Sequence, residues 1–230
     1  MQFIEKNSFN VRSAVYHLAK NDGSPNFLLF PMIHVGSQSF YDEISRMLAS
    51  CDLILTEGVT SKRVQLLTLS YQVVKYIRRM DLVLQRDALK TDAFRGKLIN
   101  ADLAANVFDA RWSSLPLTLR FQLFLRLPVY IIYLALFGTR QTLAENIALE
   151  DLPSQDEVLN EDSFADLDSL IIDERDRKLL DNIRQTYESG GDKTVGVIYG
   201  ATHMRNAIDF LLRKLNYHIT KAEWITVFDL

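Results

Sequence analysis

The sequence contains one cysteine, Cys51, so the chain cannot form an internal disulfide bond. This cysteine usage is typical of a protein from a reducing compartment. Cys51 follows a segment with helical periodicity and precedes a short apolar segment, which predicts a small buried residue rather than a nucleophile.

The chain also lacks a strong excess of charge of either sign. A net charge of -3 over 230 residues gives no general attraction for phosphate, which argues against nucleic acid as a partner. The start of the chain, residues 1–7, has neither a basic segment nor the apolar run of a secretory signal, so we expect a cytoplasmic protein. A hydrophobic content of 48% is ordinary for a globular chain with a proper core.

No uncharged apolar run reaches the roughly twenty residues that cross a bilayer. The most hydrophobic stretch, Leu115 to Phe137, contains Arg120 and Arg126 and is interrupted by Pro116 and Pro128. We therefore expect no transmembrane helix there. Three interpretations stay open, namely buried cap helices, an arm that forms a homodimer, and a helix in peripheral contact with a membrane.

Strand and helix signals alternate along the chain. Apolar and β-branched runs predict strands at residues 11–19, 26–33, 53–55, 97–103 and 194–200 and an extended tail over 217–228. Helical periodicity predicts helices at residues 38–49, 61–84, 172–189 and 205–215, the first capped by Ser37 or Ser39. Turn formers at 21–25 predict a hairpin, and the acidic segment 150–168 predicts an exposed loop or lid.

Two of the predicted strands close on a histidine and are each followed by a helix pattern. The run Phe27 to Ile33 ends at His34, and the run Thr194 to Gly200 is followed by His203. A third strand, over residues 53–55, leads into Glu57. Parallel strands joined by right-handed crossovers present their carboxyl ends at one edge of the sheet, where ligands bind in open sheets. We therefore expect His34, Glu57 and His203 to converge.

Two imidazoles and a carboxylate form a ligand set that manganese, cobalt or zinc accepts. A site with three protein ligands keeps open positions, and a water bound there becomes acidic enough to attack a carbonyl near neutral pH. The alternatives are that each histidine is structural and that Glu57 caps a helix. His17 and His218 lie in predicted strands without such companions, and we interpret both as structural.

Arg175 opens the helix predicted at 172–189. Its planar guanidinium suits a substrate carboxylate or a developing oxyanion. The alternative is an ion pair at the helix start with Asp173, Glu174 or Asp176. Two further candidates rank lower: Tyr199, in the last strand before the tail, and Asp102, which is as well explained as a helix cap.

Four motifs together resemble the TraB/PrgY/GumN family, which includes the TIKI proteases. They are Phe30-Pro31-Met32-Ile33-His34-Val35-Gly36, Leu55-Thr56-Glu57-Gly58, Asp173-Glu174-Arg175-Asp176 and Gly200-Ala201-Thr202-His203. The family is marked by two Gly-x-x-His elements, a glutamate that ends the second strand and a Glu-Arg pair that opens a late helix. The first element here has Pro31 in place of the glycine, and the second is intact.

This resemblance implies an α/β fold like that of erythromycin esterase-like and ChaN-like proteins. Its central sheet would be mixed but largely parallel, built from two loosely related strand-helix-strand halves with a helical cap inserted between them. One domain would span residues 1–230, with the sheet core at 1–60 and 190–230 and the cap and connections at 61–189. The resemblance also gives His34, Glu57 and His203 the metal-site or catalytic positions and Arg175 the position of the family's arginine.

The sequence thus predicts a hydrolase that depends on a divalent metal ion and acts on a peptide or small-molecule substrate, a TIKI-like peptidase. The competing prediction is a protein of the same fold without catalytic activity, which binds a peptide or a haem-like ligand or regulates another protein at a membrane.

Overall fold

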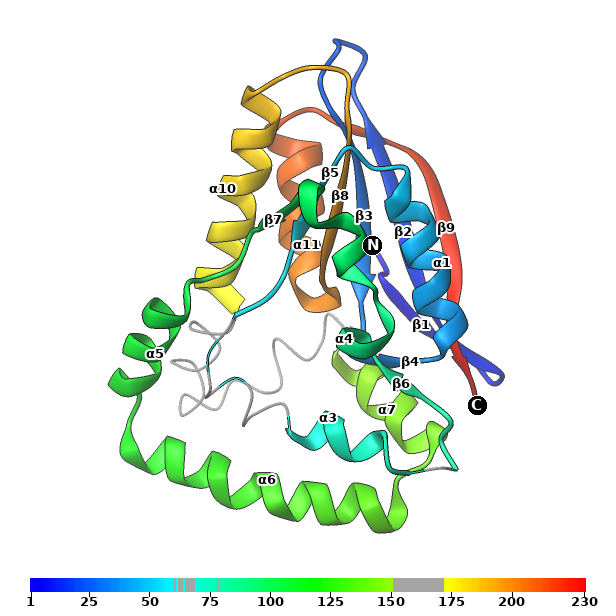
Figure 1. Ribbon diagram of the computed structural model, residues 1–230, viewed down its shortest axis with the longest axis vertical. Coiled ribbons are helices and arrows are strands. Elements are labelled where there is room, and N and C mark those ends of the chain that lie inside the picture. Colours follow the sequence, from blue (N-terminus) through cyan, green and yellow to red (C-terminus); the bar gives the residue numbers. More distant parts are fainter. Residues whose placement is uncertain (60, 62–63, 65–68, 78, 151–171) are drawn as a thin grey trace.

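The computed structural model describes residues 1–59, 61, 64, 69–77, 79–150 and 172–230. Its centre is a seven-stranded sheet with the order β1-β2-β3-β8-β5-β7, in which β9 pairs with β2 (Figure 1). The strands are β1 (Ile4–Lys6), β2 (Asn10–Ala19), β3 (Asn26–Met32), β5 (Leu53–Thr56), β7 (Leu98–Asn100), β8 (Thr194–Gly200) and β9 (His218–Asp229). A second, two-stranded sheet pairs β4 (Val35–Gly36) with β6 (Val83–Leu84). The predicted α/β class with a mixed central sheet is confirmed.

The parallel part of this sheet consists of β3, β8, β5 and β7. In this register Met32 lies opposite Gly200, and Thr56 lies opposite both Ile198 and Asn100. The four strands therefore end at one edge of the sheet. The antiparallel part, β1, β2 and β9, supports it from the side, and the predicted hairpin of β2 and β3 is confirmed by the pairing of Tyr16 with Leu29.

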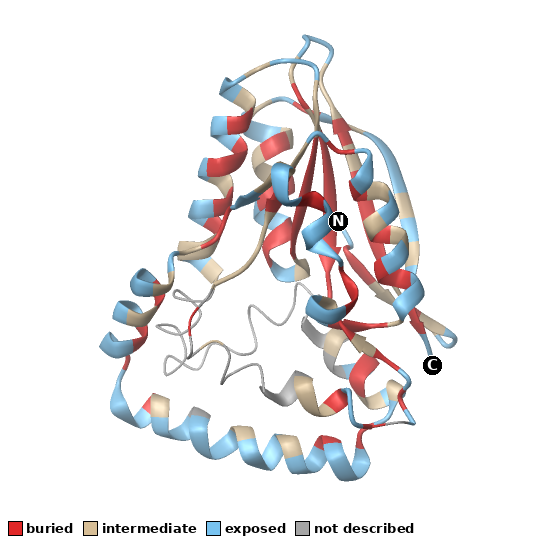
Figure 2. Cartoon of the chain, in the orientation of Figure 1, coloured by how far each residue is buried: buried red, intermediate tan, exposed pale blue. Residues whose placement is uncertain are grey.

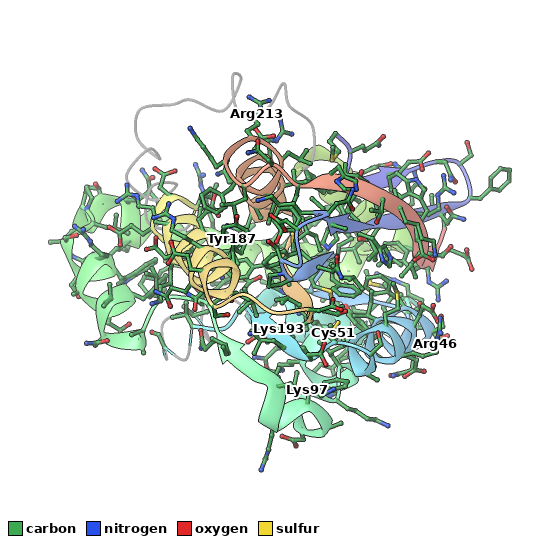
Figure 3. The ribbon with its side chains drawn as sticks, turned by 90° about the horizontal axis from the view of Figure 1, so that it is seen from above. Arg46, Cys51, Lys97, Tyr187, Lys193 and Arg213 are labelled. Carbon is green, nitrogen blue, oxygen red and sulfur yellow. The ribbon has the colours of Figure 1, made fainter. Side chains whose placement is uncertain are left out.

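Helices cover both faces of the sheet. Viewed along the strands (Figure 3), α1 (Gln38–Ala49), marked by Arg46, and the π-helical η3 (Phe210–Lys214), marked by Arg213, lie on opposite sides. The apolar face of α1 buries Phe40, Tyr41, Ile44 and Leu48. The N-terminus of α1 is capped by Ser37, whose Oγ accepts a hydrogen bond from the Phe40 N–H.

The other helices follow the predictions less evenly. Near the end of the chain lie α10 (Glu174–Glu188) and α11 (Ala201–Asp209); between β5 and α10 the described elements include α3 (Leu69–Val74), α4 (Gln85–Ala88), the 3-10 helix η1 (Thr91–Lys97), α5 (Ala105–Ser114), α6 (Leu117–Phe137) and α7 (Arg140–Glu150). The α10 helix confirms the prediction at 172–189. The loop or lid predicted at 150–168 lies outside the described residues except for Glu150, which ends α7.

The single long helix predicted for residues 61–84 is wrong at its C-terminal end. The chain leaves the helix after Val74, and Val83 and Leu84 belong to β6. Between them Asp81 adopts a positive φ of 49°, which an α-helix does not accommodate. Ile77, Met80 and Leu82 are buried outside the helix, so the apolar residues of this segment do not share one helical face.

Buried cap helices were one interpretation of Leu115 to Phe137, and this interpretation is wrong for most of the segment. Residues 117–137 form one helix, and most of its large apolar side chains are exposed (Figure 2). Among the described residues, α6 is the one helix long and apolar enough to cross a membrane by length and composition. Pro128 does not end it, in contrast to the interruption predicted from the sequence.

The helix predicted for residues 205–215 begins earlier, at Ala201. His203 consequently lies in the first turn of α11 rather than in a loop after β8. Gly200 ends β8 and is also the N-cap residue of α11, so one glycine joins the strand directly to the helix.

Candidate functional site

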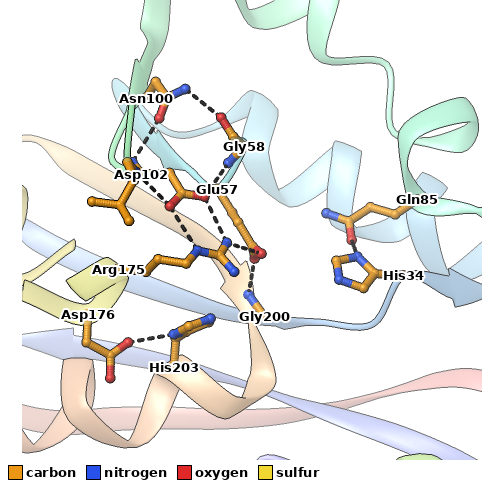
Figure 4. A network of polar contacts seen from close by, with 11 residues as sticks. His34, Glu57, Gly58, Gln85, Asn100, Asp102, Arg175, Asp176, Gly200 and His203 are labelled. Carbon is orange, nitrogen blue, oxygen red and sulfur yellow. Dashed lines mark hydrogen bonds and ion pairs between the residues drawn. The ribbon is translucent and has the colours of Figure 1, made fainter. Parts of the chain in front are cut away.

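Six polar residues gather where the parallel strands end (Figure 4). Glu57 directly follows β5, and its backbone N–H donates to the carbonyl of Ile198 in β8. Asp102 follows β7, and His34 lies between β3 and β4. The other three come from helix starts, Arg175 and Asp176 in the first turn of α10 and His203 in the first turn of α11.

The centre of this site is an ion-pair network in which Arg175 binds two carboxylates. Its Nη2 donates to Glu57 Oε1, and its Nε and Nη2 donate to the two oxygens of Asp102 at 2.9 and 2.8 Å. The Asp102 side chain is fully buried, and the other two are 14% exposed. The alternative of an ion pair within α10 is therefore wrong for Arg175, because its partners follow β5 and β7 while Glu174 pairs with Arg111.

Hydrogen bonds among Gly58, Asn100 and Asp102 hold Asp102 in this orientation. Its Oδ2 accepts from the Gly58 N–H at 3.0 Å, and its own N–H donates to Asn100 Oδ1 at 2.8 Å. The Asn100 amide in turn donates to the Gly58 carbonyl at 2.9 Å. Asp102 is thus a fixed anchor for Arg175, although the sequence ranked it only as a secondary candidate.

Glu57 is the carboxylate that reaches the adjoining pocket. Burial disfavours its ionised form, but the positive charges of Arg175 and, more weakly, of His34 and His203 outweigh this effect and lower the pKa of Glu57 below its ordinary value. Its Oε2 accepts from the Gly200 N–H at 2.6 Å. Glu57 therefore stays a carboxylate across the neutral pH range.

Gly200 allows the close approach of Glu57 and His203. A Cβ atom at this position would lie 3.3 Å from Glu57 Oε2 and 3.4 Å from His203 Cδ2, closer than most such contacts. The glycine of the second Gly-x-x-His element therefore has a steric role. It brings a carboxylate and an imidazole together at the end of β8.

His203 is buried, with 4% of its side chain exposed. Its Nδ1 lies 2.6 Å from Asp176 Oδ1, and the second oxygen of Asp176 accepts from the Asn206 side chain. A carboxylate at Nδ1 fixes the ring orientation and directs Nε2 away from Asp176 (Figure 4), as occurs behind many metal-binding or basic histidines. The sequence did not indicate that Asp176 contacts His203 and Asn206, because Asp176 was considered only as a possible ion-pair partner of Arg175.

His34 differs from His203 because its side chain is exposed. Its Nδ1 lies 3.3 Å from Oε1 of Gln85, the first residue of α4, and the Gln85 N–H donates to the His34 carbonyl at 2.9 Å. Gln85 therefore fixes both the backbone and the ring of His34. No local sequence pattern indicates this contact, which joins residues 51 positions apart.

Tyr199 packs behind the charged residues. Its ring meets the His203 ring edge-on at a centroid distance of 5.0 Å, and the Arg175 guanidinium lies 5.7 Å from its centroid. Burial, followed by the negative charge of Asp102, raises the pKa of Tyr199. The buried Tyr199 ring is therefore uncharged and packs against both Arg175 and His203.

A pocket of about 420 Å³ opens beside this network. His34, Glu57 and Arg175 line it together with Gln72, Gln85 and Arg86, and its apolar lining consists of Val59, Val64, Leu84, Leu89 and Phe108. The volume lies in the range of small-molecule and side-chain pockets. His203 is not part of this lining, so two of the three predicted strand-end residues reach the pocket and the third lies behind Gly200.

The charges of this site favour a positively charged ligand. The carboxylates of Glu57, Asp102 and Asp176 face one guanidinium and one imidazole. With these carboxylates ionised and His34 and His203 neutral, the three negative charges of the cluster exceed the single positive charge of Arg175. A surplus of buried negative charge is costly unless a cation offsets it.

The predicted metal ligands fit a divalent ion in chemical type but not as a preformed cage. A carboxylate has about four lone-pair positions, and Glu57 uses two of them in its bonds from Arg175 and Gly200. Among the described residues, however, no group of three or more histidine, cysteine, aspartate or glutamate side chains is close enough to hold a metal ion. Coordination by His34, Glu57 and His203 would therefore require their side chains to move.

Comparison of the chain with protein-family models, with curated proteins and with solved structures gives no match, so the family resemblance depends on the sequence motifs alone.

Proposed function

We propose that this protein is a divalent-metal-dependent hydrolase, a peptidase similar to the TIKI members of the TraB/PrgY/GumN family. The observation that supports it best is the pocket at the carboxyl end of the parallel strands, lined by His34, Glu57 and Arg175. These are three of the four residues that the motifs select. The fourth, His203, lies at the end of the adjacent strand with its ring held by Asp176.

In this proposal His34, Glu57 and His203 would hold Mn²⁺, Co²⁺ or Zn²⁺. When bound, such an ion would lower the pKa of a water molecule and polarise a substrate carbonyl. Asp176 holds the His203 ring in the orientation that leaves Nε2 for a ligand or a proton. The surplus negative charge of the cluster raises the affinity for the cation.

Arg175 orients the substrate in this scheme. Its Nε and Nη2 are used by Glu57 and Asp102, which leaves Nη1 as the donor for a substrate carboxylate or carbonyl oxygen. The apolar lining accepts a side chain of the substrate. At the level of architecture, we propose that the α3–α7 region is the family's helical cap and that β3-α1-β5 and β8-α11-β9 are its two related halves.

Metal titration and turnover of a peptide library test this proposal. The wild-type protein should bind Mn²⁺, Co²⁺ or Zn²⁺ in calorimetry and cleave peptides only when loaded. His34→Ala is the most informative variant because the side chain is exposed, so the fold should survive while metal binding and cleavage are lost. His218→Ala is the matched control, since His218 is an exposed histidine of β9 remote from these strand ends.

Two results would count against the proposal. Cleavage that survives both chelation and His34→Ala would remove the metal mechanism. Tight binding of a peptide or of haem without turnover, lost in Glu57→Gln, would favour the competing function of a binding protein that uses the same pocket.

A further inference from the structure

We infer that α6 is a membrane-surface helix that docks the protein onto a bilayer containing anionic lipid. Six side chains form what we call the α6 face: Leu117, Phe121, Leu125, Val129, Ile132 and Leu136. Their spacing of three or four residues places them on one side of the helix. Each of them is between 58% and 75% exposed.

The α6 face is a continuous apolar strip and not a set of scattered residues. Ten of the exposed large hydrophobic residues of the described chain lie in this one helix, against seven elsewhere. At 1.5 Å per residue the strip is about 30 Å long, and a contiguous exposed apolar patch of this kind is typical of a contact surface for a protein or a membrane. Water contact along such a strip is unfavourable, so a partner surface is expected.

The opposite side of α6 belongs to the protein. Leu119 is buried in a small cluster with Phe108, Trp112 and Leu115, and Leu134 is buried in the main core. Arg79 donates from its guanidinium to the carbonyls of Leu136 and Gly138 at the C-terminal end of the helix. The helix is therefore fixed to the molecule along one side, which suits a helix lying in a membrane surface rather than one crossing the bilayer.

The position of α6 allows contact with a flat surface along its whole length. It runs across one end of the molecule, on the far side of α3 from the sheet, and no described element lies beyond it in this view (Figure 1). Its outer side is exposed from end to end (Figure 2).

Charge favours lipid over a second copy of the chain. Residues 110–144 contain four arginines and no aspartate or glutamate, although the whole chain carries a net charge of -3. Two of these arginines, Arg120 and Arg126, belong to α6 itself. A two-fold dimer through the α6 face would place like charges together, whereas anionic headgroups complement them.

Co-sedimentation with vesicles tests the inference. The full-length protein should pellet with vesicles of phosphatidylcholine and phosphatidylglycerol, and more weakly with phosphatidylcholine alone. The double variant Leu125→Glu and Ile132→Glu should lower the partition coefficient at least about tenfold. Arg126→Gln should lower it about fivefold on the anionic vesicles only.

The matched control introduces the same charges at exposed apolar positions away from α6. Phe9→Glu combined with Ile99→Glu should leave binding unchanged, because Phe9 lies in the turn before β2 and Ile99 in β7. Light scattering after size-exclusion chromatography measures the oligomeric state in parallel. Equal losses in both double variants, or no vesicle binding by the wild type, would overturn the inference. A dimer that becomes monomeric only in the α6 variant, without vesicle binding, would assign the face to a second copy instead.

Discussion

The charged residues of this site are largely buried, and each is stabilised by an opposite charge or by a hydrogen bond. Glu57 is the clearest case, since its carboxylate lies against the guanidinium of Arg175 and a backbone N–H of Gly200. Replacement by glutamine keeps the shape but removes the charge. Arg175 would then keep its ion pair with Asp102 but lose the one with Glu57.

We therefore expect Glu57→Gln to destabilise the protein by about 1–3 kcal/mol at neutral pH. Because the folded-state pKa of Glu57 lies below its ordinary value of 4.5, the contribution of Glu57 is fully present above that pH and is lost as pH falls through the folded-state pKa. The difference in unfolding free energy between wild type and variant should be constant from pH 8 to about 5.5 and shrink in acid. Urea denaturation at a series of pH values measures it, and a difference that grows in acid would contradict the assignment.

Gly200→Ala tests the steric role of the glycine after β8. Its φ of -52° is open to alanine, so any effect comes from space and not from the backbone. The added methyl group would press on Glu57 Oε2 and His203 Cδ2. We expect a loss of about 1 kcal/mol in stability together with loss of the proposed metal binding. Gly96→Ala is the control because no atom lies within 4 Å of its added Cβ, and equal effects of the two variants would refute the steric role.

At the scale of secondary-structure elements, the site depends on the start of α10 meeting the start of α11. Asp176 makes this contact through His203 and Asn206, and all three come from these two helices. Asp176→Ala should cost about 2 kcal/mol, because it leaves the buried His203 imidazole without its partner. Asp181→Ala on the same helix should change stability by less than about 0.5 kcal/mol, since the Asp181 side chain is 58% exposed and its pair with Arg184 is long, at 3.9 Å. Thermal unfolding compares them, and similar shifts in Tm would contradict the role of Asp176.

The elements with a complete local signal were predictable from sequence. The helix at 38–49 was predicted at its exact bounds because its apolar spacing and its Ser37 cap agree. Strand-end residues were also predictable, since a buried run that stops at Glu57 or His34 leaves a polar group at the sheet edge. Segment 61–84 was not, because turns that bury apolar residues produce nearly the same spacing as a helix.

Contacts between distant residues were beyond the sequence signal. From the sequence, Asp102 was explained as a helix cap and Asp176 as an ion-pair partner of Arg175 at the helix start. In the folded chain Asp102 binds Arg175 and Asp176 binds His203. The sequence was also insufficient for α6. Its apolar composition was evident, but composition does not tell which side of a helix is covered by the protein.

On the scale of the whole molecule, the two ends of the chain close the sheet. β9 pairs with β2 from Asn10 opposite Asp229 to Ala19 opposite His218, and the Leu230 N–H donates to the Phe9 carbonyl at 2.8 Å. The same core contains Phe3 and Phe228. Pairing across this sequence separation makes unfolding cooperative, since the sheet cannot lose β9 without exposing core residues.

Cys51 offers a direct measure of this cooperativity. It lies before β5, at the end of the sheet opposite the site, where Lys97 Nζ donates to the Cys51 carbonyl at 2.7 Å. The residue is fully buried, burial raises the pKa of its thiol to about 11, and a Cβ at Gly196 would lie 3.1 Å from its Sγ. A reagent therefore reaches the thiol only when the packing of α1 against the sheet opens.

We expect the native protein to react with a thiol reagent at least about a thousandfold more slowly than the unfolded chain, with a rate that follows the global unfolding equilibrium in low urea. The control is a Ser114→Cys variant, whose new thiol at the exposed end of α5 should react within the mixing time while Cys51 stays protected. Rapid reaction of one thiol per native wild-type chain, without urea dependence, would show that α1 and β5 open locally. In that case the closed sheet would not fix the strand ends that carry Glu57 and Gly200. The Arg175 network alone would then have to supply the rigidity that the site requires.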